Sequence, residues 1–191
     1  MLKGILLGII LGFILVGVGG YLYFASGKVP VATNSPEMPF ERKFAQLALH
    51  AYLDKLPHPN PAVPADEANL MAGAKVYKEN CAVCHGLPGE PHNAIGNGMF
   101  PKPPLLFRGV GVTNDTWETY GKASGGIRMT GMPGFKDRLS DTQLWQVTVL
   151  LKNADKIPAP VKAELAPPPG AVLLPAAPPG SKADSDHDHI H

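Results

Sequence analysis

The chain has 191 residues, with 17 Lys and Arg against 16 Asp and Glu and a formal net charge of +1. This length allows one modest domain with appendages, and the near-neutral charge argues against a nucleic-acid or acidic-polymer partner. The 21 Pro and 21 Gly residues cluster outside the middle of the chain, so we expect one compact core with irregular flanks.

The N-terminus contains a long apolar stretch. Between Lys3 and Lys28 no residue is charged. About twenty apolar residues in a helix span the ~30 Å hydrocarbon core of a bilayer. We therefore expect residues 1–28 to form a single-pass transmembrane anchor, with residues 4–26 in the membrane. The alternative is a cleaved secretory signal, which would have a shorter apolar region and a small-x-small cleavage site.

Residues 29–64 are predicted to be a Pro-rich linker that contains one amphipathic helix. Between Phe40 and Leu56, apolar residues recur every three or four positions, at Phe40, Phe44, Leu47, Ala48, Ala51 and Tyr52. This spacing predicts a helix with one apolar stripe, and the prolines that follow end it. The stripe would dock on the next domain or lie near the membrane surface. His50 and His58 are interpreted as surface or packing residues, with an iron ligand or partner contact as the alternative.

Residues 65–158 are predicted to form the compact domain. Its first helix has acidic residues in its first turn, where the helix dipole favours them. Three of its apolar positions are spaced to face a core: Leu70, Ala74 and Tyr77. Gly73 inside this helix would cost about 1 kcal/mol relative to Ala, and a close helix crossing would explain its presence.

The strongest chemical signal is the run Cys81-Ala82-Val83-Cys84-His85. Two thiols three positions apart, with a His directly after the second, are the pattern of covalent c-type haem attachment. Sulfurs one helical turn apart can both reach one edge of the porphyrin, and His85 would be an axial iron ligand. We therefore expect one haem c, covalently bound through Cys81 and Cys84.

Three other interpretations of the two cysteines fit less well. A thioredoxin-like redox pair needs a βαβ setting, and no strand-rich stretch precedes this motif. A zinc site would need a second Cys or His pair at ligand spacing, and none follows. A disulfide between residues this close would be strained.

Residues 70–77, followed by residues 81–86, resemble the opening of a class I c-type cytochrome. In that family a small Gly and an aromatic residue pack the first helix against the last, and Gly73 and Tyr77 match these positions. The resemblance implies an all-α fold, with a small class I cytochrome c-like haem domain behind the N-terminal transmembrane helix and irregular Pro-rich flanks.

Residues 86–112 form a loop rich in Pro and Gly, which forbid long regular structure. In the family such a loop covers one haem face, and a backbone carbonyl next to a Pro accepts the Nδ1–H of the ligand His. Pro103 and Pro104 are candidates for this role. Arg108 would neutralise a haem propionate or be solvated.

A short helix over residues 116–122 is expected next, capped by Asn114 or Asp115. It carries Trp117 and Tyr120. These side chains would pack on the haem edge, bond a propionate or simply fill the core.

The second iron ligand is expected within Thr130-Gly131-Met132-Pro133-Gly134. A thioether sulfur is a soft, weak ligand and needs a shaped loop to hold it on iron. This run, with a Phe after it, resembles the sixth-ligand loop of class I c-type cytochromes, so Met132 is the predicted ligand. Met129 and Met99 are the alternatives and are expected to be packing residues.

The last helix begins at Ser140, its predicted N-cap. One face carries Leu144, Val147, Thr148 and Leu151. It matches the family's C-terminal helix, which crosses the first helix near the position of Gly73. Residues 159–191 contain Pro, Ala and Gly with little to bury, so we expect disorder there. The alternating His and Asp of residues 184–191 would give at most incidental metal affinity.

The two ligand motifs together predict function. Filled axial positions leave no open iron site, so the protein should carry single electrons and not be an enzyme. Its partners would be a redox protein donor and acceptor, themselves membrane-bound. Family resemblance places haem attachment, and so the soluble domain, on the periplasmic side of a bacterial inner membrane. Two alternatives remain: a fixed subunit of a larger oxidase or dehydrogenase, and a haem sensor or peroxidase in which Met132 is displaceable.

Overall fold

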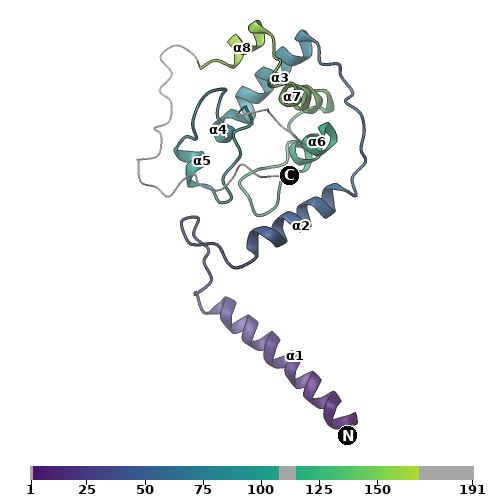
Figure 1. The fold of residues 1–191 in the computed structure, drawn as a ribbon, viewed down its shortest axis with the longest axis vertical. Helices are drawn as coiled ribbons and strands as arrows, with labels where there is room; N and C mark the ends of the chain where they lie inside the picture. The colour runs from purple at the N-terminus through teal and green to yellow at the C-terminus, as the bar shows by residue number, and fades with distance from the viewer. Residues whose placement is uncertain (1, 108–114, 168–191) are drawn as a thin grey trace. The chain divides into compact units, whose positions relative to one another are not determined.

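The computed structural model describes residues 2–107 and 115–167 (Figure 1). These residues form eight helices and no strand, so the predicted all-α fold class is confirmed for the part of the chain that is described. The chain divides into two compact units, Met1–Ala45 and Gln46–His191.

The first unit contains helix α1, Leu2–Ala25. None of its residues is buried, and it is long and apolar enough to cross a membrane. By length and composition it therefore agrees with the predicted span of residues 4–26. A signal sequence near an N-terminus would meet the same criterion.

Helix α2, Glu41–Leu53, confirms the helix expected between Phe40 and Leu56, with tighter bounds. The predicted apolar stripe, however, faces solvent: the exposed fractions of Phe44, Leu47 and Tyr52 are 68%, 66% and 53%. Leu47 and Tyr52, which belong to the second unit, are therefore not buried on the following domain, the first of the two positions expected for this stripe.

The residues that do dock lie on the opposite face of α2. Leu53 is 2% exposed, and it packs with Leu56 against Gly121 of α6, Thr116–Gly125. A Cβ at Gly121 would lie 3.0 Å from Leu56 Cδ1 and 3.3 Å from Leu53 Cδ2. The helix therefore has two apolar faces. The face with Leu53 packs on α6, because Gly121 has no side chain to keep it away.

The core of the second unit is built on α3, Glu67–Asn80, and α7, Asp141–Lys152. Both begin at the caps that the sequence offers, with Asp66 accepting from the Asn69 N–H and Ser140 from the Gln143 N–H. A Cβ at Gly73 would lie only 2.3 Å from the Gln146 carbonyl oxygen. The close helix crossing predicted from Gly73 is therefore confirmed.

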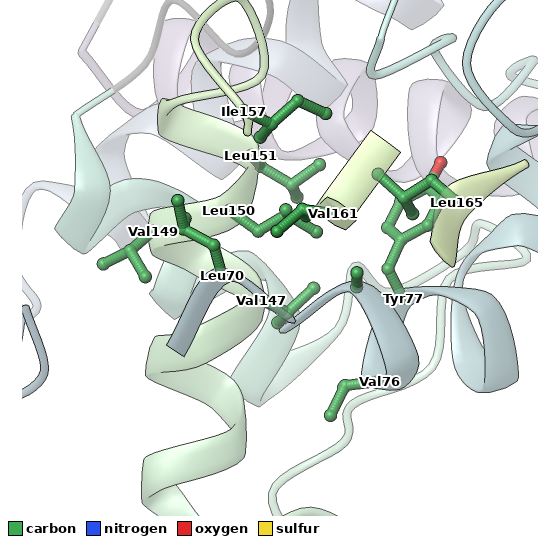
Figure 2. Packing of buried hydrophobic residues seen from close by; sticks show 11 residues of the cluster. Leu70, Val76, Tyr77, Val147, Val149, Leu150, Leu151, Ile157, Val161 and Leu165 are labelled. Carbon is green, nitrogen blue, oxygen red and sulfur yellow. The ribbon is translucent and has the colours of Figure 1, made fainter. Parts of the chain in front are cut away.

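A third helix, α8, Ala159–Leu165, completes this core. Val161 and Leu165 are fully buried and lie among side chains of α3 and α7 (Figure 2). At the same place Lys78 Nζ donates to the Glu164 carbonyl at 2.6 Å. Disorder from residue 159 onward is thus wrong for α8, because its two apolar residues fill a gap that the crossing of α3 and α7 leaves open. Residues 168–191, with their His and Asp, lie outside the described residues.

Candidate haem-binding site

The two cysteines stand at the junction of α3 with the short helix α4, Ala82–His85. Cys81 N–H donates to the Tyr77 carbonyl at 2.8 Å, and His85 N–H donates to the Cys81 carbonyl at 3.0 Å. The backbone thus stays helical through the motif, which places the two sulfurs about one turn apart. Both thiols are free and half-buried. Burial raises the pKa of the Cys81 thiol to about 12, and Cys84 adds to this shift.

The imidazole of His85 is held from the side of Nδ1. This nitrogen lies 2.8 Å from the Pro104 carbonyl oxygen. A carbonyl oxygen can only accept, so Nδ1 carries the proton and Nε2 keeps its lone pair for a metal. Burial lowers the pKa of His85 and His92 lowers it further, while the bond to Pro104 acts in the opposite direction. Of the two prolines proposed for this contact, the structure selects Pro104.

His92 is a site residue that sequence reasoning missed. Its Nε2 lies 2.6 Å from the carbonyl oxygen of Pro103, directly before the carbonyl that holds His85. The loop therefore presents two consecutive carbonyls to two imidazoles. No local sequence pattern predicts this contact, because it depends on how the chain folds back between residues 92 and 103.

Helix α5, Ala94–Gly98, fastens the same loop to the motif. The Asn93 side chain donates to the Val83 carbonyl at 2.9 Å. A Cβ at Gly96 would lie 3.0 Å from the Cys84 carbonyl oxygen. A side chain at position 96 would push α5 away from α4, and with it the loop that supplies Pro104.

Met132 lies in a loop that is closed at both ends. Ile127 N–H donates to the Met132 carbonyl at 3.1 Å, and Met132 N–H donates to the Thr130 hydroxyl, also at 3.1 Å. Gly126 has φ +69°, and a Cβ there would lie 2.4 Å from the Gly134 nitrogen. The ends of the loop thus approach closely at Gly126 and Gly134, where no side chain stands between them. This close approach fixes the backbone of the half-buried Met132.

The two alternative methionines occupy different places. Met129 has a positive φ of 62° and is 93% exposed, so its side chain points into solvent. Met99 lies against Gly131, where a Cβ would be 3.2 Å from its sulfur. This contact brings the loop that follows the Cys motif next to the loop that carries Met132.

The aromatic residues of α6 pack on other side chains of the protein. Trp117 stacks on His58 with ring centroids 3.7 Å apart, and Tyr120 stacks on Trp145 at 4.2 Å. Tyr120 also donates a hydrogen bond to Asp141, which raises its pKa. The packing role expected for His58 is confirmed, and His50 is exposed, as a surface residue would be.

Of the residues expected to cap α6 or to neutralise a propionate, the structure describes only Asp115. Asp115 precedes the helix, and its side chain makes no capping hydrogen bond. Asn114 and Arg108 lie outside the described residues.

These donors fit a covalently held haem. Two half-buried thiols lie about one turn apart, and an imidazole is oriented with one nitrogen free for iron. A thioether is carried on a loop whose shape is fixed by hydrogen bonds and glycines. Thiol, imidazole and thioether are the groups with which a c-type cytochrome attaches and ligates its haem.

Comparison with known proteins gives the family. The model of the family described as cytochrome c oxidase, cbb3-type, subunit III matches residues 68–151. Cytochrome c6 of Leptolyngbya boryana is 36% identical over 96 residues, which cover 47% of this chain and 98% of that protein.

Other relatives are much longer than the matched region. The cbb3-type cytochrome c oxidase subunit FixP of Azorhizobium caulinodans is 32% identical over 46% of this chain and 28% of its own length. The cytochrome c subunit of a quinone-dependent alcohol dehydrogenase of Gluconobacter oxydans is 36% identical over 43% of this chain, but over only 18% of its own length. No solved structure matches the chain significantly. Because the similarity to cytochrome c6 spans nearly that whole protein, and the family model matches residues 68–151 around the Cys motif and Met132, this chain belongs to the class I c-type cytochromes.

Proposed function

We propose that this protein is a membrane-anchored mono-haem c-type cytochrome that transfers single electrons between redox proteins on the periplasmic face of a bacterial inner membrane. The observation that carries the proposal is the orientation of His85, whose Nδ1 is engaged by the Pro104 carbonyl at 2.8 Å. An imidazole held in this way presents Nε2 to a metal, directly beside two thiols that can attach a porphyrin.

Each residue has a distinct role in this proposal. Cys81 and Cys84 would hold the haem covalently, and His85 and Met132 would be the two residues that ligate its iron. The haem iron supplies a one-electron couple between its ferrous and ferric states. The Pro104 carbonyl keeps His85 in one orientation and raises its basicity. The closed loop of residues 126–134 limits the movement of Met132.

The proposed pair of iron ligands also implies what the protein does not do. A ligand pair of His and Met leaves no open coordination site for a substrate, so the protein acts as a carrier and not as an enzyme. Met ligation raises the potential relative to His alone. The anchor α1 confines the haem domain to the membrane, which raises its effective concentration for membrane-bound donors and acceptors.

The test is the absorption spectrum of the purified full-length protein in its oxidised and reduced forms. We expect covalently bound haem and the weak long-wavelength band of ferric haem that reports a Met sulfur on iron. Met132→Ala should abolish this band, whereas Met129→Ala, at an exposed position, should keep it. Retention of the band in Met132→Ala and its loss in Met99→Ala would move the ligand assignment to Met99.

A band that is absent from the wild-type protein would contradict the carrier function. The sixth position would then be open or weakly held. Rapid binding of carbon monoxide by the reduced protein would in that case favour a sensor or peroxidase.

A second candidate function is a fixed subunit of a larger redox complex. Similarity to proteins named as subunits of a cbb3-type oxidase and of a dehydrogenase favours it. Purification from the native membrane in mild detergent distinguishes the two. A free carrier elutes alone, whereas a subunit elutes with partners in fixed stoichiometry.

A further inference from the structure

Helix α2 has a second apolar face, and the side chains of this face are exposed. Leu53 on one side of the helix is 2% exposed, whereas Phe44 and Leu47 on the other side are 68% and 66% exposed. Phe40, which directly precedes the helix, is 64% exposed. The transfer of apolar side chains out of water lowers the free energy. We therefore expect this outer face to contact a second apolar environment.

The outer face is an organised aromatic surface and not a set of scattered residues. The rings of Phe40 and Phe44 meet edge to face, with centroids 6.4 Å apart. Lys43 Nζ lies 5.9 Å from the centre of the Phe40 ring. The Lys43 ammonium group thus lies over the face of an aromatic ring, a cation–π contact, and it supplies a basic group at the edge of this apolar surface, as is found at a lipid headgroup boundary.

The position of this face in the chain identifies its occupant. Only residues 26–40 separate the end of α1 from the start of α2. A segment of this length reaches at most roughly 50 Å when fully extended. If α1 spans the bilayer, α2 can never be far from the membrane surface, and lipid is the apolar environment always within its reach.

We propose that α2 lies in the plane of the bilayer interface, with Phe40, Phe44 and Leu47 among the lipid acyl chains and Lys43 at the phosphates. This inference rests on the proposed membrane anchor. An interfacial helix needs an apolar face and adjacent basic residues, and binds more strongly to anionic lipid. Because Leu53 of the same helix packs on Gly121, α2 would hold α6 close to the membrane surface.

The experiment uses the full-length haem-loaded protein, one copy per nanodisc of phosphatidylethanolamine and phosphatidylglycerol. A nitroxide is attached at Leu47→Cys or, as the matched control, at Gln46→Cys. Both positions are exposed, but they point about 100° apart around the helix. The native cysteines do not react with the label once they are bonded to haem. Collision rates are measured with oxygen, which partitions into lipid, and with a polar nickel chelate, which stays in water.

The proposal predicts a several-fold higher ratio of oxygen to nickel collisions at position 47 than at position 46. A label at Phe44→Cys should behave like that at position 47. Equal, water-like ratios at positions 44, 46 and 47 would overturn the proposal. So would protection at position 47 that appears only when several copies share one vesicle, with spin–spin broadening, because the occupant would then be a second copy.

Two further readouts separate this failure from failure of the proposed function. A label at Leu15→Cys in α1 reports whether the anchor itself is in lipid, and the absorption spectrum reports whether haem is bound. Lipid exposure at position 15 and a normal spectrum, together with water exposure at position 47, would reject the interfacial helix alone. Water exposure at position 15 would reject the anchor, and the interfacial helix with it.

Discussion

Two neighbouring carbonyl groups hold the imidazole of His85, the proposed iron ligand, and that of His92. Pro104 accepts from His85 at 2.8 Å, and Pro103 accepts from His92 at 2.6 Å. Because the two prolines are consecutive, the contact made by His92 also limits the positions that the Pro104 carbonyl can take. We therefore expect His92 to be a positioning residue, which acts on the proposed ligand His85 through the backbone of Pro103 and Pro104.

Replacing His92 should change the redox potential. In His92→Ala the Pro104 carbonyl is held less firmly, so His85 becomes a less basic ligand and stabilises ferric iron less. The midpoint potential should rise, as measured by potentiometric titration of the haem absorbance. His92→Gln keeps an N–H donor near the position of Nε2 and should lie closer to wild type. Identical potentials in His92→Ala and wild type would show that His92 does not position the loop.

Tyr77 makes a buried hydrogen bond beside the attachment motif. Its hydroxyl donates to the Gly86 carbonyl at 2.6 Å, and burial raises its pKa. Tyr77→Phe leaves this carbonyl without its donor, so the free energy of unfolding should fall by about 1–3 kcal/mol. Denaturant unfolding measures it, with Tyr120→Phe, at a half-buried tyrosine whose hydroxyl bonds the exposed Asp141, as control. A loss at Tyr77 no larger than the loss at Tyr120 would contradict the prediction.

At the scale of helices, the crossing of α3 and α7 depends on one missing side chain. In Gly73→Ala the new methyl group would lie 2.3 Å from the Gln146 carbonyl oxygen, so the helices must move apart. Overpacking of this kind costs about 1–3 kcal/mol, visible in a thermal or denaturant melt. Gly98→Ala is the matched control, because no atom lies within 4 Å of the new Cβ. Equal stability of the two variants would show that the crossing tolerates a side chain.

The helices of the core could be predicted from the sequence because their signals are local. The periodic apolar residues of α3 and α7 and the caps at Asp66 and Ser140 lie within a few residues of the structure they specify. The Cys motif is likewise a local pattern, and the fold class followed from the resemblance to class I c-type cytochromes that this motif and the first helix carry.

What could not be predicted depends on surfaces formed by distant residues. Helix α8 buries only Val161 and Leu165. Their burial stabilises the helix only after α3 and α7 have crossed and formed the surface that covers them. For α2, periodicity revealed an apolar stripe, but Gly121 of α6 decides that the face with Leu53 is the one that docks. The contact of His92 with Pro103 is likewise a product of the folded loop.

At the scale of the whole molecule, the proposed haem site and helix α1 lie in different units of the chain. The core helices and all proposed ligands lie in the unit Gln46–His191. A protease site inserted within residues 31–36 should therefore release a fragment whose spectrum and potential equal those of the intact protein. The same site inserted at residues 153–156 should instead destabilise the fold, since α8 would lose its covalent link to α7. A changed spectrum after the first cut would contradict this independence.

The order of the helices along the chain also determines when the core can form during synthesis. The ribosome delivers α3 and the Cys motif early, while the partners of α3, helices α7 and α8, are the last described helices to emerge. A core closed by contacts so distant in sequence forms slowly, and it cannot begin to close before Gln146 has been made. Throughout that interval Cys81 and Cys84 sit on an open chain. In the proposed function, the two thiols would therefore be accessible to haem before the core closes, and the late emergence of α7 and α8 would lengthen that interval.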